Sequence, residues 1–479
     1  MSKRNYLPEE WENIKLLVDS FEEIVASNDQ PFFDVKEFET IIDFFMFRLN
    51  YKKCEEAIKH ALKLYPNNTV FLFQKAELFS QCSREHQALE ILKYLEKIEP
   101  QNTEVYIKKG SLYHHYKEYE KAIKEYFKAI KTVSNELEVS NIYVDIAEEY
   151  IYIDDIENSF EYIHKSIKLN PDNESVLRIT NFICNAEDEE YLNYTVDVLH
   201  DFLEEFPFSL PLWIALGNVY EILEHYFKAI EAYDYAIAIN PSHMLPYLNK
   251  AQVFSNLEDY NNAIKVYKQM LALEENPDCW ILNLIGECYE ELNKPETARK
   301  YFTKATETDS LDYESWINLG FNYLNNDEPQ KALDCMEEAL QTVPAEFPDI
   351  LFIKAKAFTY LKRYEEAFPQ FELLLAVKDK NPDVWIDYAD AVEEYKGTNA
   401  AIKILERGIK KFPDYAALQY RISACKFKSG KQSQGLLCLY NAMSKDFSGM
   451  DVFFKYMPEL KNSKNILKLI ELVHKNIKH

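Results

Sequence analysis

The fold of this chain is decided by residues 213–241, which read WIALGNVYEILEHYFKAIEAYDYAIAINP. The first half sets large side chains around one small residue, Gly217. The second half places small and aromatic residues at helical spacing, among them Ala229 and Tyr233, and ends at Pro241. Two antiparallel helices approach closely only where side chains are small, so the pattern predicts a helix pair that interlocks large against small residues. Proline cannot continue the second helix and therefore ends it.

The same pattern recurs along most of the chain, at a period of about 34 residues. The first small position of each second helix holds Cys54, Ala88, Ala122, Ser159, Thr195, Ala229, Ala263, Ala298, Ala332, Ala367, Ala401 and Gly435. One pair alone cannot bury its apolar faces, but stacked pairs can. We therefore predict an all-α solenoid of about twelve helix pairs between residues 35 and 449, with a helical cap at each end.

The repeats divide the chain into five segments. These are a capping helix in 1–34, repeats 1 to 4 in 35–173, a degenerate repeat in 174–209, repeats 6 to 12 in 210–449, and basic capping helices in 450–479. Thr195 replaces alanine in the degenerate repeat, and its first helix has no clear small residue. We therefore expect irregular stacking or a bend there.

The repeat closely resembles the tetratricopeptide repeat family. The match covers most of the chain and is carried by Trp213, Leu216, Gly217 and Tyr220, with Gly320 in the matching place of a later repeat. The resemblance implies a right-handed superhelix of helix pairs. It also implies a scaffold or adaptor that binds a protein or peptide in a concave groove lined by the first helices, without catalysis. A composition rich in Lys, Asn, Ile and Tyr resembles long cytosolic repeat proteins of Bacteroidota, which implies a bacterial source.

Charge is unevenly spread along the chain. The formal net charge is −26, yet residues 402–479 hold 15 basic and 6 acidic residues. The acidic body disfavours nucleic acid as a partner of the main surface. The basic end, with Arg421 and Lys428, has three interpretations. It contacts RNA in a regulatory role or an acidic protein surface, it docks onto the acidic body of a second copy to give a homo-oligomer, or it is simply solvated.

Several classes of protein find no support in the sequence. No stretch is apolar enough to span a membrane, and the N-terminus lacks the apolar core of a signal peptide. The eight cysteines contain no Cys-x-x-Cys pair, so we expect reduced core cysteines and a cytoplasmic location. No nucleotide-binding, metal-binding or hydrolase motif occurs. We therefore expect no cofactor, no metal and no enzymatic activity.

The repeat also projects which residues of the first helices face the groove. Ile214, Asn218, Ile317 and Phe352 form a mixed apolar and polar row, which suits an extended or helical peptide. The alternative for each apolar residue is contact between successive helices. In one subfamily that grips chaperone tails, a lysine precedes the asparagine that Asn218 matches. Here Ile214 stands in its place, so a co-chaperone is the weaker alternative.

Acidic residues dominate the projected groove positions of two repeats. They are Glu287, Glu290 and Glu291 in the eighth repeat and Asp390, Glu393 and Glu394 in the eleventh. One hypothesis is an acidic groove that receives a basic segment of a partner, with charge steering the encounter. The alternative is a solvated helical face in an acidic protein.

Overall fold

The computed structural model describes residues 8–27, 32–185, 189–273, 278–377 and 381–477. These residues form helices joined by short turns, with no strand among them. The chain divides into two compact units, Met1–Asn249 and Lys250–His479, and each is described by itself. The division falls within α14 (Met244–Asn256).

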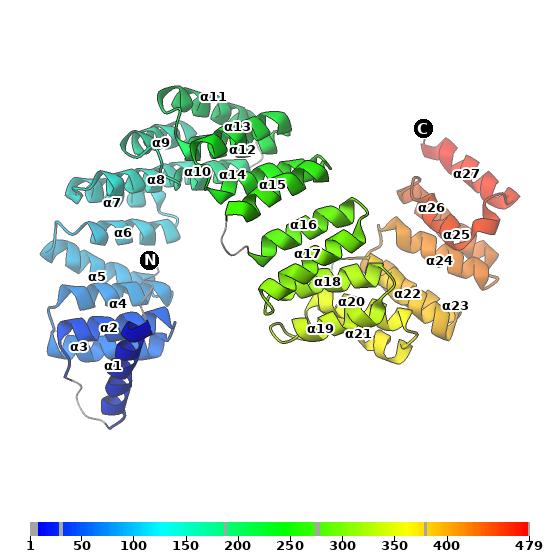
Figure 1. Ribbon diagram of the computed structural model, residues 1–479, viewed down its shortest axis with the longest axis horizontal. Helices are drawn as coiled ribbons and strands as arrows, with labels where there is room; N and C mark the ends of the chain where they lie inside the picture. The colour runs from blue at the N-terminus through cyan, green and yellow to red at the C-terminus, as the bar shows by residue number, and fades with distance from the viewer. Residues whose placement is uncertain (1–7, 28–31, 186–188, 274–277, 378–380, 478–479) are drawn as a thin grey trace. The chain divides into compact units, whose positions relative to one another are not determined.

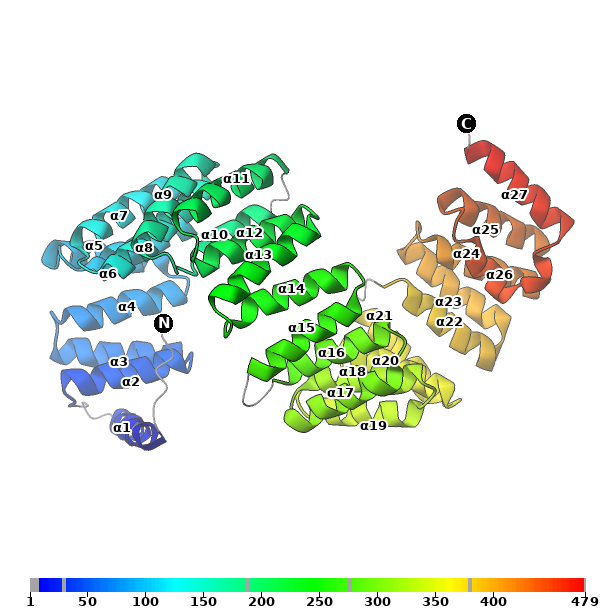
Figure 2. The same cartoon turned by 45° about the horizontal axis from the view of Figure 1, so that its top comes forward.

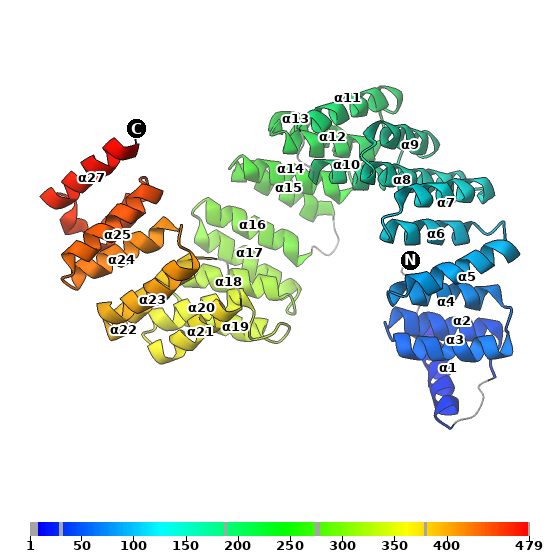
Figure 3. The same cartoon turned by 180° about the vertical axis from the view of Figure 1, so that it is seen from behind.

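The first unit contains a capping helix followed by helix pairs (Figure 1). Its helices are α1 (Pro8–Ala26), α2 (Val35–Phe47), α3 (Tyr51–Leu64), α4 (Thr69–Gln81), α5 (Glu85–Ile98), α6 (Thr103–His115), α7 (Tyr119–Thr132), α8 (Glu136–Tyr152), α9 (Ile156–Leu169), α10 (Val176–Asn185), α11 (Glu189–Glu205), α12 (Leu210–Ile222) and α13 (Tyr226–Ile239). Seen from behind, α6 and α7 lie side by side, as do α8 and α9 (Figure 3).

The second unit continues the same plan. Its helices are α15 (Tyr260–Leu273), α16 (Cys279–Glu291), α17 (Pro295–Thr308), α18 (Tyr313–Asn325), α19 (Pro329–Ala339), α20 (Pro348–Tyr360), α21 (Tyr364–Ala376), α22 (Asp383–Lys396), α23 (Thr398–Lys411), α24 (Ala416–Lys428), α25 (Gln432–Lys445), α26 (Met450–Tyr456) and α27 (Lys464–Ile477). From α2 to α25 the described helices form twelve pairs, which confirms the predicted all-α stack.

Both ends of the described chain carry the predicted caps. Phe21 of α1 is 2% exposed and packs on Phe38 and Phe45 of α2. At the other end, Figure 2 shows α26 and α27 beside the last helix pair, and Phe453 packs on Phe427 of α24. The caps cover apolar surface that the terminal pairs would otherwise expose.

In three of the described first helices the small residue, a glycine, lies against an aromatic ring of the second helix. A Cβ atom added to Gly217 would lie 2.3 Å from Tyr233, and one added to Gly286 would lie 2.3 Å from Phe302. The rings occupy the volume that any larger residue would need. This is the physical reason for the small and aromatic alternation in the sequence.

Prolines and caps together turn the chain from one pair into the next. Two residues after Pro66, the side chain of Asn68 accepts a hydrogen bond from the Phe71 amide and caps α4. Asn102 follows Pro100 at the same distance and caps α6. Proline thus ends one helix, and a short polar side chain starts the next.

The turns within the pairs contain residues with positive φ that are not glycine. These are Leu49, Ser83, Lys117, Asp154, Glu224, Glu258, Asn293, Asp327 and Lys362. These turns therefore adopt the left-handed conformation without glycine. Each turn closes through left-handed backbone at a cost of roughly 1–2 kcal/mol, which the packed helices on either side offset.

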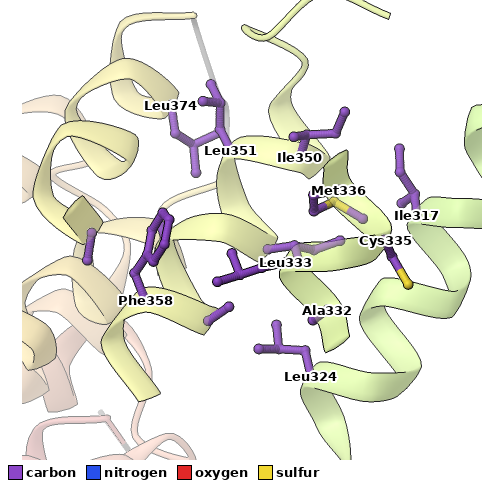
Figure 4. Close-up of a cluster of buried hydrophobic side chains, with 14 of the residues drawn as sticks. Ile317, Leu324, Ala332, Leu333, Cys335, Met336, Ile350, Leu351, Phe358 and Leu374 are labelled. Carbon is purple, nitrogen blue, oxygen red and sulfur yellow. The ribbon is translucent and has the colours of Figure 1, made fainter. Parts of the chain in front are cut away.

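The core of the second unit illustrates how neighbouring pairs share apolar side chains. Figure 4 shows Ile317 of α18, Met336 of α19, Leu351 of α20 and Leu374 of α21 in one cluster. Met336 is fully buried, and Leu351 is 1% exposed. The stack is therefore held by contacts both within and between pairs.

The segment 174–209 differs in its helix lengths. α10 has 10 residues and α11 has 17, whereas α12 has 13. Both α10 and α11 pack against α12. The turn between α10 and α11 lies outside the described residues, and the bend in this segment stays a prediction.

Candidate functional site

The second unit contains a hollow of about 710 Å³ between α20, α22, α26 and the start of α19. Its charged lining consists of Asp327, Asp383, Asp387, Asp390 and Glu394 with Lys356, Lys362 and Lys455. The rings of Tyr360 and Tyr456 and the side chain of Ile386 complete its walls. The hollow thus combines an excess of carboxylates with apolar surface.

Polar side chains tie several first helices to the next first helix at a recurrent sequence separation. Lys356 Nζ lies 2.6 Å from Asp387 Oδ1, and Lys108 Nζ lies 3.0 Å from Glu77 Oε1 in the first unit. In both pairs the partners are 31 residues apart. These ion pairs hold neighbouring repeats together and neutralise part of the charge on this face.

The acidic residues predicted in the eleventh repeat lie on α22, and two of them, Asp390 and Glu394, line the hollow. An open acidic face would require unpaired carboxylates, but all three of these carboxylates form ion pairs. Asp390 Oδ1 lies 2.7 Å from Arg421 Nε, and Glu393 also pairs with Arg421. Glu394 pairs with Lys362.

Arg421 was assigned from the sequence to a basic surface, and this assignment is wrong. Its side chain is 1% exposed and lies against α22 and α26. The guanidinium carbon is 4.0 Å from the centroid of the Tyr456 ring, and the Tyr456 hydroxyl donates to Asp390 Oδ2 at 2.8 Å. The carboxylates of α22 attract Arg421 inward, and together they fix the cap helix that forms one wall of the hollow.

The carboxyl groups of α22 respond differently to their surroundings. Burial acts to raise the pKa of Glu393, but the hydrogen bond and charge of Arg421 outweigh it, and the pKa is lowered. The hydrogen bond from Lys362 lowers the pKa of Glu394. For Asp387, burial raises the pKa despite the neighbouring Lys356. Asp387 is therefore the carboxylate here whose ionised form a further cation would stabilise.

The acidic residues predicted in the eighth repeat lie on α16 and do not line this hollow. Asn318 Nδ2 donates to Glu287 Oε1 at 3.2 Å, and Asn322 bonds to Glu290. Glu291 is exposed. The two acidic groups predicted from the repeat are thus not part of one site.

Two of the apolar groove candidates are wrong because their side chains are buried. Ile214 is 1% exposed, and Ile317 is 6% exposed and belongs to the core cluster of Figure 4. Phe352 is half-buried, with its ring 6.1 Å from that of Phe321. Contact between successive helices, the alternative for these positions, describes Ile214 and Ile317.

Asn218 is partly exposed and lies in a row of side-chain amides. Its Nδ2 donates to Asn181 Oδ1 at 3.0 Å. Its Oδ1 accepts from Asn249 Nδ2 at 2.8 Å and from the Tyr233 hydroxyl at 2.9 Å. Asn218 therefore joins three successive first helices of the first unit.

Sequence reasoning missed Asp383, Lys356, Tyr360 and Tyr456 in the hollow. One signal was available, because a lysine and an aspartate 31 residues apart match adjacent positions of successive first helices. Tyr456 carried no such signal, since the cap lies outside the repeat pattern.

Other lysines of the basic end also have internal partners. Lys428 Nζ is 3.4 Å from Glu393 Oε2, and Lys445 Nζ is 3.0 Å from Asp414 Oδ1. These pairs reduce the positive charge available for RNA. In the stretches that the structure describes, no group of three or more metal-ligating side chains is placed to hold an ion.

Family models for the tetratricopeptide repeat match residues 140–173, 211–243, 246–277 and 281–310. The stretch 211–243 spans α12 and α13, the pair predicted from the opening sequence pattern. Within the described ranges, no helix is both long enough and apolar enough to cross a membrane.

Three curated relatives align at low identity. A BBSome complex member from Bos taurus is 23% identical over 54% of this chain and 50% of its own length. Subunit 3 of the anaphase-promoting complex from Schizosaccharomyces pombe is 21% identical over 53% of this chain and 38% of its own length. A repeat-containing protein from Methanocaldococcus jannaschii is 23% identical over 75% of this chain and 67% of its own length. The chain thus spans half or less of the first two relatives.

Among solved structures, a tetratricopeptide repeat protein from Parabacteroides merdae matches 55% of this chain and 98% of its own, at 16% identity and a TM-score of 0.42.

The repeats that the family models match extend over four of the twelve helix pairs. Repeats of this kind build extended interaction surfaces. The chain is a tetratricopeptide repeat protein of the protein-interaction scaffold type.

Proposed function

We propose that this protein is an adaptor that holds an extended, basic segment of a partner protein in the hollow of its second unit. The observation that carries the proposal is the lining, in which five carboxylates face three ammonium groups. An excess of one charge in a recess concentrates and orients segments of the opposite charge.

Two carboxylates are available to such a segment. Asp327 is exposed and lies in the turn before α19, and Asp383 is exposed and accepts a hydrogen bond from Tyr415 at 2.7 Å. Neither has a lysine or arginine partner among the described ion pairs. Burial disfavours the ionised form of Asp387, and a cation bound in the hollow would stabilise that form.

The walls suit the rest of a basic side chain. Lysine and arginine pack their aliphatic stems on apolar surface while the charged end reaches a carboxylate. Tyr360, Ile386 and Tyr456 provide that surface. The lysines of the hollow would repel a second charge placed out of register, so spacing along the segment matters as well as its net charge.

The experiment compares two fluorescein-labelled nine-residue peptides by anisotropy, one with lysine and one with glutamate at every second position. The full chain should bind the lysine peptide and not the glutamate peptide, and binding should weaken as salt rises. Replacing Asp383 with lysine turns an attraction of about 1 kcal/mol at 4 Å in water into an equal repulsion. The double variant Asp327→Lys, Asp383→Lys should therefore lose binding.

The matched control is Glu406→Lys, which reverses an exposed carboxylate of α23 that does not line the hollow. This variant should bind the lysine peptide as the parent chain does. Equal loss in the control and the double variant would show that only the net charge acts, and the proposal would be wrong. The cytoplasmic location, the bacterial source and the homo-oligomer stay predictions from the sequence.

A further inference from the structure

The first unit carries a second concentration of acidic groups, on and beside α8. The cluster consists of the carboxyl groups of Asp145, Glu148 and Glu149 and the rings of His114, Tyr152 and Phe182. We call it the acid–aromatic cluster. Its residues come from α6, α8 and α10, which are the first helices of three successive pairs. The proposed hollow of the second unit contains none of them.

The carboxylates of this cluster are short of positive charge. Arg178 Nη2 lies 2.9 Å from Asp145 Oδ1 and 3.0 Å from Glu148 Oε2, so one guanidinium serves two carboxylates. Glu149 has no lysine or arginine partner among the described ion pairs. Its Oε1 lies 2.9 Å from His114 Nδ1, and its Oε2 is buried without a hydrogen-bond partner.

Glu149 is 2% exposed, and its surroundings shift its pKa. Burial, with the nearby charges of Glu148 and Asp145, raises its pKa from 4.5 to about 8. The groups that face it are His114 on α6, Tyr126 on α7, Arg178 on α10, and Asp145 and Glu148 on α8. Burial likewise raises the pKa of Asp145 against the effect of Arg178. A carboxyl group buried with one oxygen unpaired and no lysine or arginine bound to it is costly for the fold.

The rings beside these carboxylates are continuous and partly exposed. Tyr152 stacks on Tyr119 with centroids 5.0 Å apart, and its centroid is 4.9 Å from that of His114. Phe182 follows at 5.1 Å. Tyr152 is 37% exposed and Phe182 is 39% exposed. Aromatic faces next to carboxylates favour a planar cation that can stack and donate in the same plane.

We propose that the acid–aromatic cluster is a binding site for an arginine side chain of a partner protein. The guanidinium would stack on the half-exposed rings and donate to Asp145 and Glu148, beside the existing Arg178. Its charge would favour ionisation of Glu149, so that binding releases a proton from that carboxyl group. Arginine suits the site better than lysine because only the guanidinium is planar and donates through a fork.

The consequence for pH follows from linkage. Below about pH 8 the free protein holds the Glu149 proton and the complex does not, so affinity rises with pH. The rise approaches about tenfold per pH unit for one released proton, and the affinity levels off above that pH.

The test uses the full chain carrying Asp327→Lys and Asp383→Lys, so that the hollow of the second unit does not contribute. The probe is a labelled peptide of four Gly-Arg units, and the control probe replaces arginine with citrulline, which keeps the shape without the charge. Calorimetry at pH 7 in two buffers of different ionisation enthalpy measures the protons released. The chain with these two substitutions, which is the parent for the variants below, should release close to one proton when it binds the arginine probe. It should show no binding of the citrulline probe.

Glu149→Gln keeps a hydrogen-bonding group beside His114 and removes the titrating carboxyl group. It should release no proton and bind with an affinity that varies little between pH 6 and 8. Glu138→Gln changes an exposed carboxylate on the same helix and should behave as the parent chain. Binding without proton release, equal binding of both probes, or an unchanged pH profile in Glu149→Gln would each overturn the proposal. Since the hollow is already disabled, none of these results bears on the proposed function.

Discussion

Replacing Gly217 with alanine should loosen the pair formed by α12 and α13. The added Cβ atom would lie 2.3 Å from Cε1 of the Tyr233 ring, closer than real Cβ contacts allow. Tyr233 is fully buried, and its hydroxyl lies within hydrogen-bonding distance of Asn218 Oδ1 at 2.9 Å and of Glu221 Oε2 at 3.2 Å. The ring therefore cannot swing aside without breaking these bonds, and the two helices must separate.

Two opposing terms set the size of the effect. Alanine in a helix interior is favoured over glycine by about 1 kcal/mol. Overpacking a closely packed site costs roughly 1–3 kcal/mol. Because the clash at Gly217 involves a rigid, anchored ring, we place the overpacking cost in the upper part of its range, at about 2–3 kcal/mol, which leaves a net loss of about 1–2 kcal/mol. Gly217→Leu would add a larger side chain at the same point and should lose more.

Gly320 provides a matched control in the second unit. A Cβ atom added there would lie 2.6 Å from Cε of Met336, which is the free end of a flexible side chain. Methionine adjusts its rotamers at little cost. Gly320→Ala should therefore be neutral or stabilising by up to about 1 kcal/mol, the gain in helix propensity.

Hydrogen exchange measured by mass spectrometry is the appropriate assay, because repeat arrays open locally and a single unfolding transition would average over them. Amides of α12 and α13 should exchange about 5–30-fold faster in Gly217→Ala, as expected for a loss of one or two kcal/mol. Amides of α18 and α19 should exchange no faster in Gly320→Ala. Equal protection in both variants would refute the reasoning that the ring, not the glycine backbone, demands the small residue.

Three further changes test other parts of the structure by local exchange. The raised pKa of Glu149 means that this group binds its proton more tightly in the folded state, so stability is lost as pH rises from 4.5 to about 8. Glu149→Gln should remove this loss. The free energy of local opening of α8 should rise by on the order of 3 kcal/mol at pH 7 and should not change at pH 4. Arg421→Met leaves Asp390 and Glu393 without their guanidinium partner and should destabilise α24 and α26 by roughly 2–3 kcal/mol, the range for lost hydrogen bonds between charged groups; unchanged exchange there would contradict the role of Arg421. Glu224→Gly relieves a positive φ of 57° and should stabilise the turn before α13 by up to about 1 kcal/mol, and a loss of protection would contradict this.

Most of the fold could be predicted from residue size and spacing. Gly217 and Tyr233 predicted a close helix pair, and in the structure the Tyr233 ring packs against Gly217. Pro241 predicted a helix end, and Pro66 and Pro100 occupy the same place, each two residues before a cap of the next helix. These features succeed because they depend on contacts within one repeat, which the local sequence contains.

The candidate site could be predicted only in part. Asp390 and Glu394 do line a hollow, but the sequence pattern did not show that Arg421 and Lys362 neutralise them. Ile214 was projected onto the groove and is buried. Each of these errors concerns a contact with the next repeat, whose identity a single repeat does not contain.

The sequence by itself determined an all-α stack of twelve tetratricopeptide helix pairs with a cap at each end. It did so because the small, aromatic and proline positions of one repeat specify how its own two helices pack. Only the tertiary structure decided which charges remain available, since that depends on side chains about 31 residues apart meeting across repeats. It also decided that the cap residue Tyr456 forms a wall of the hollow and that Glu149 is buried beside half-exposed rings. Packing within a repeat is local chemistry, whereas the charge of a surface is a sum over neighbours that only the folded chain brings together.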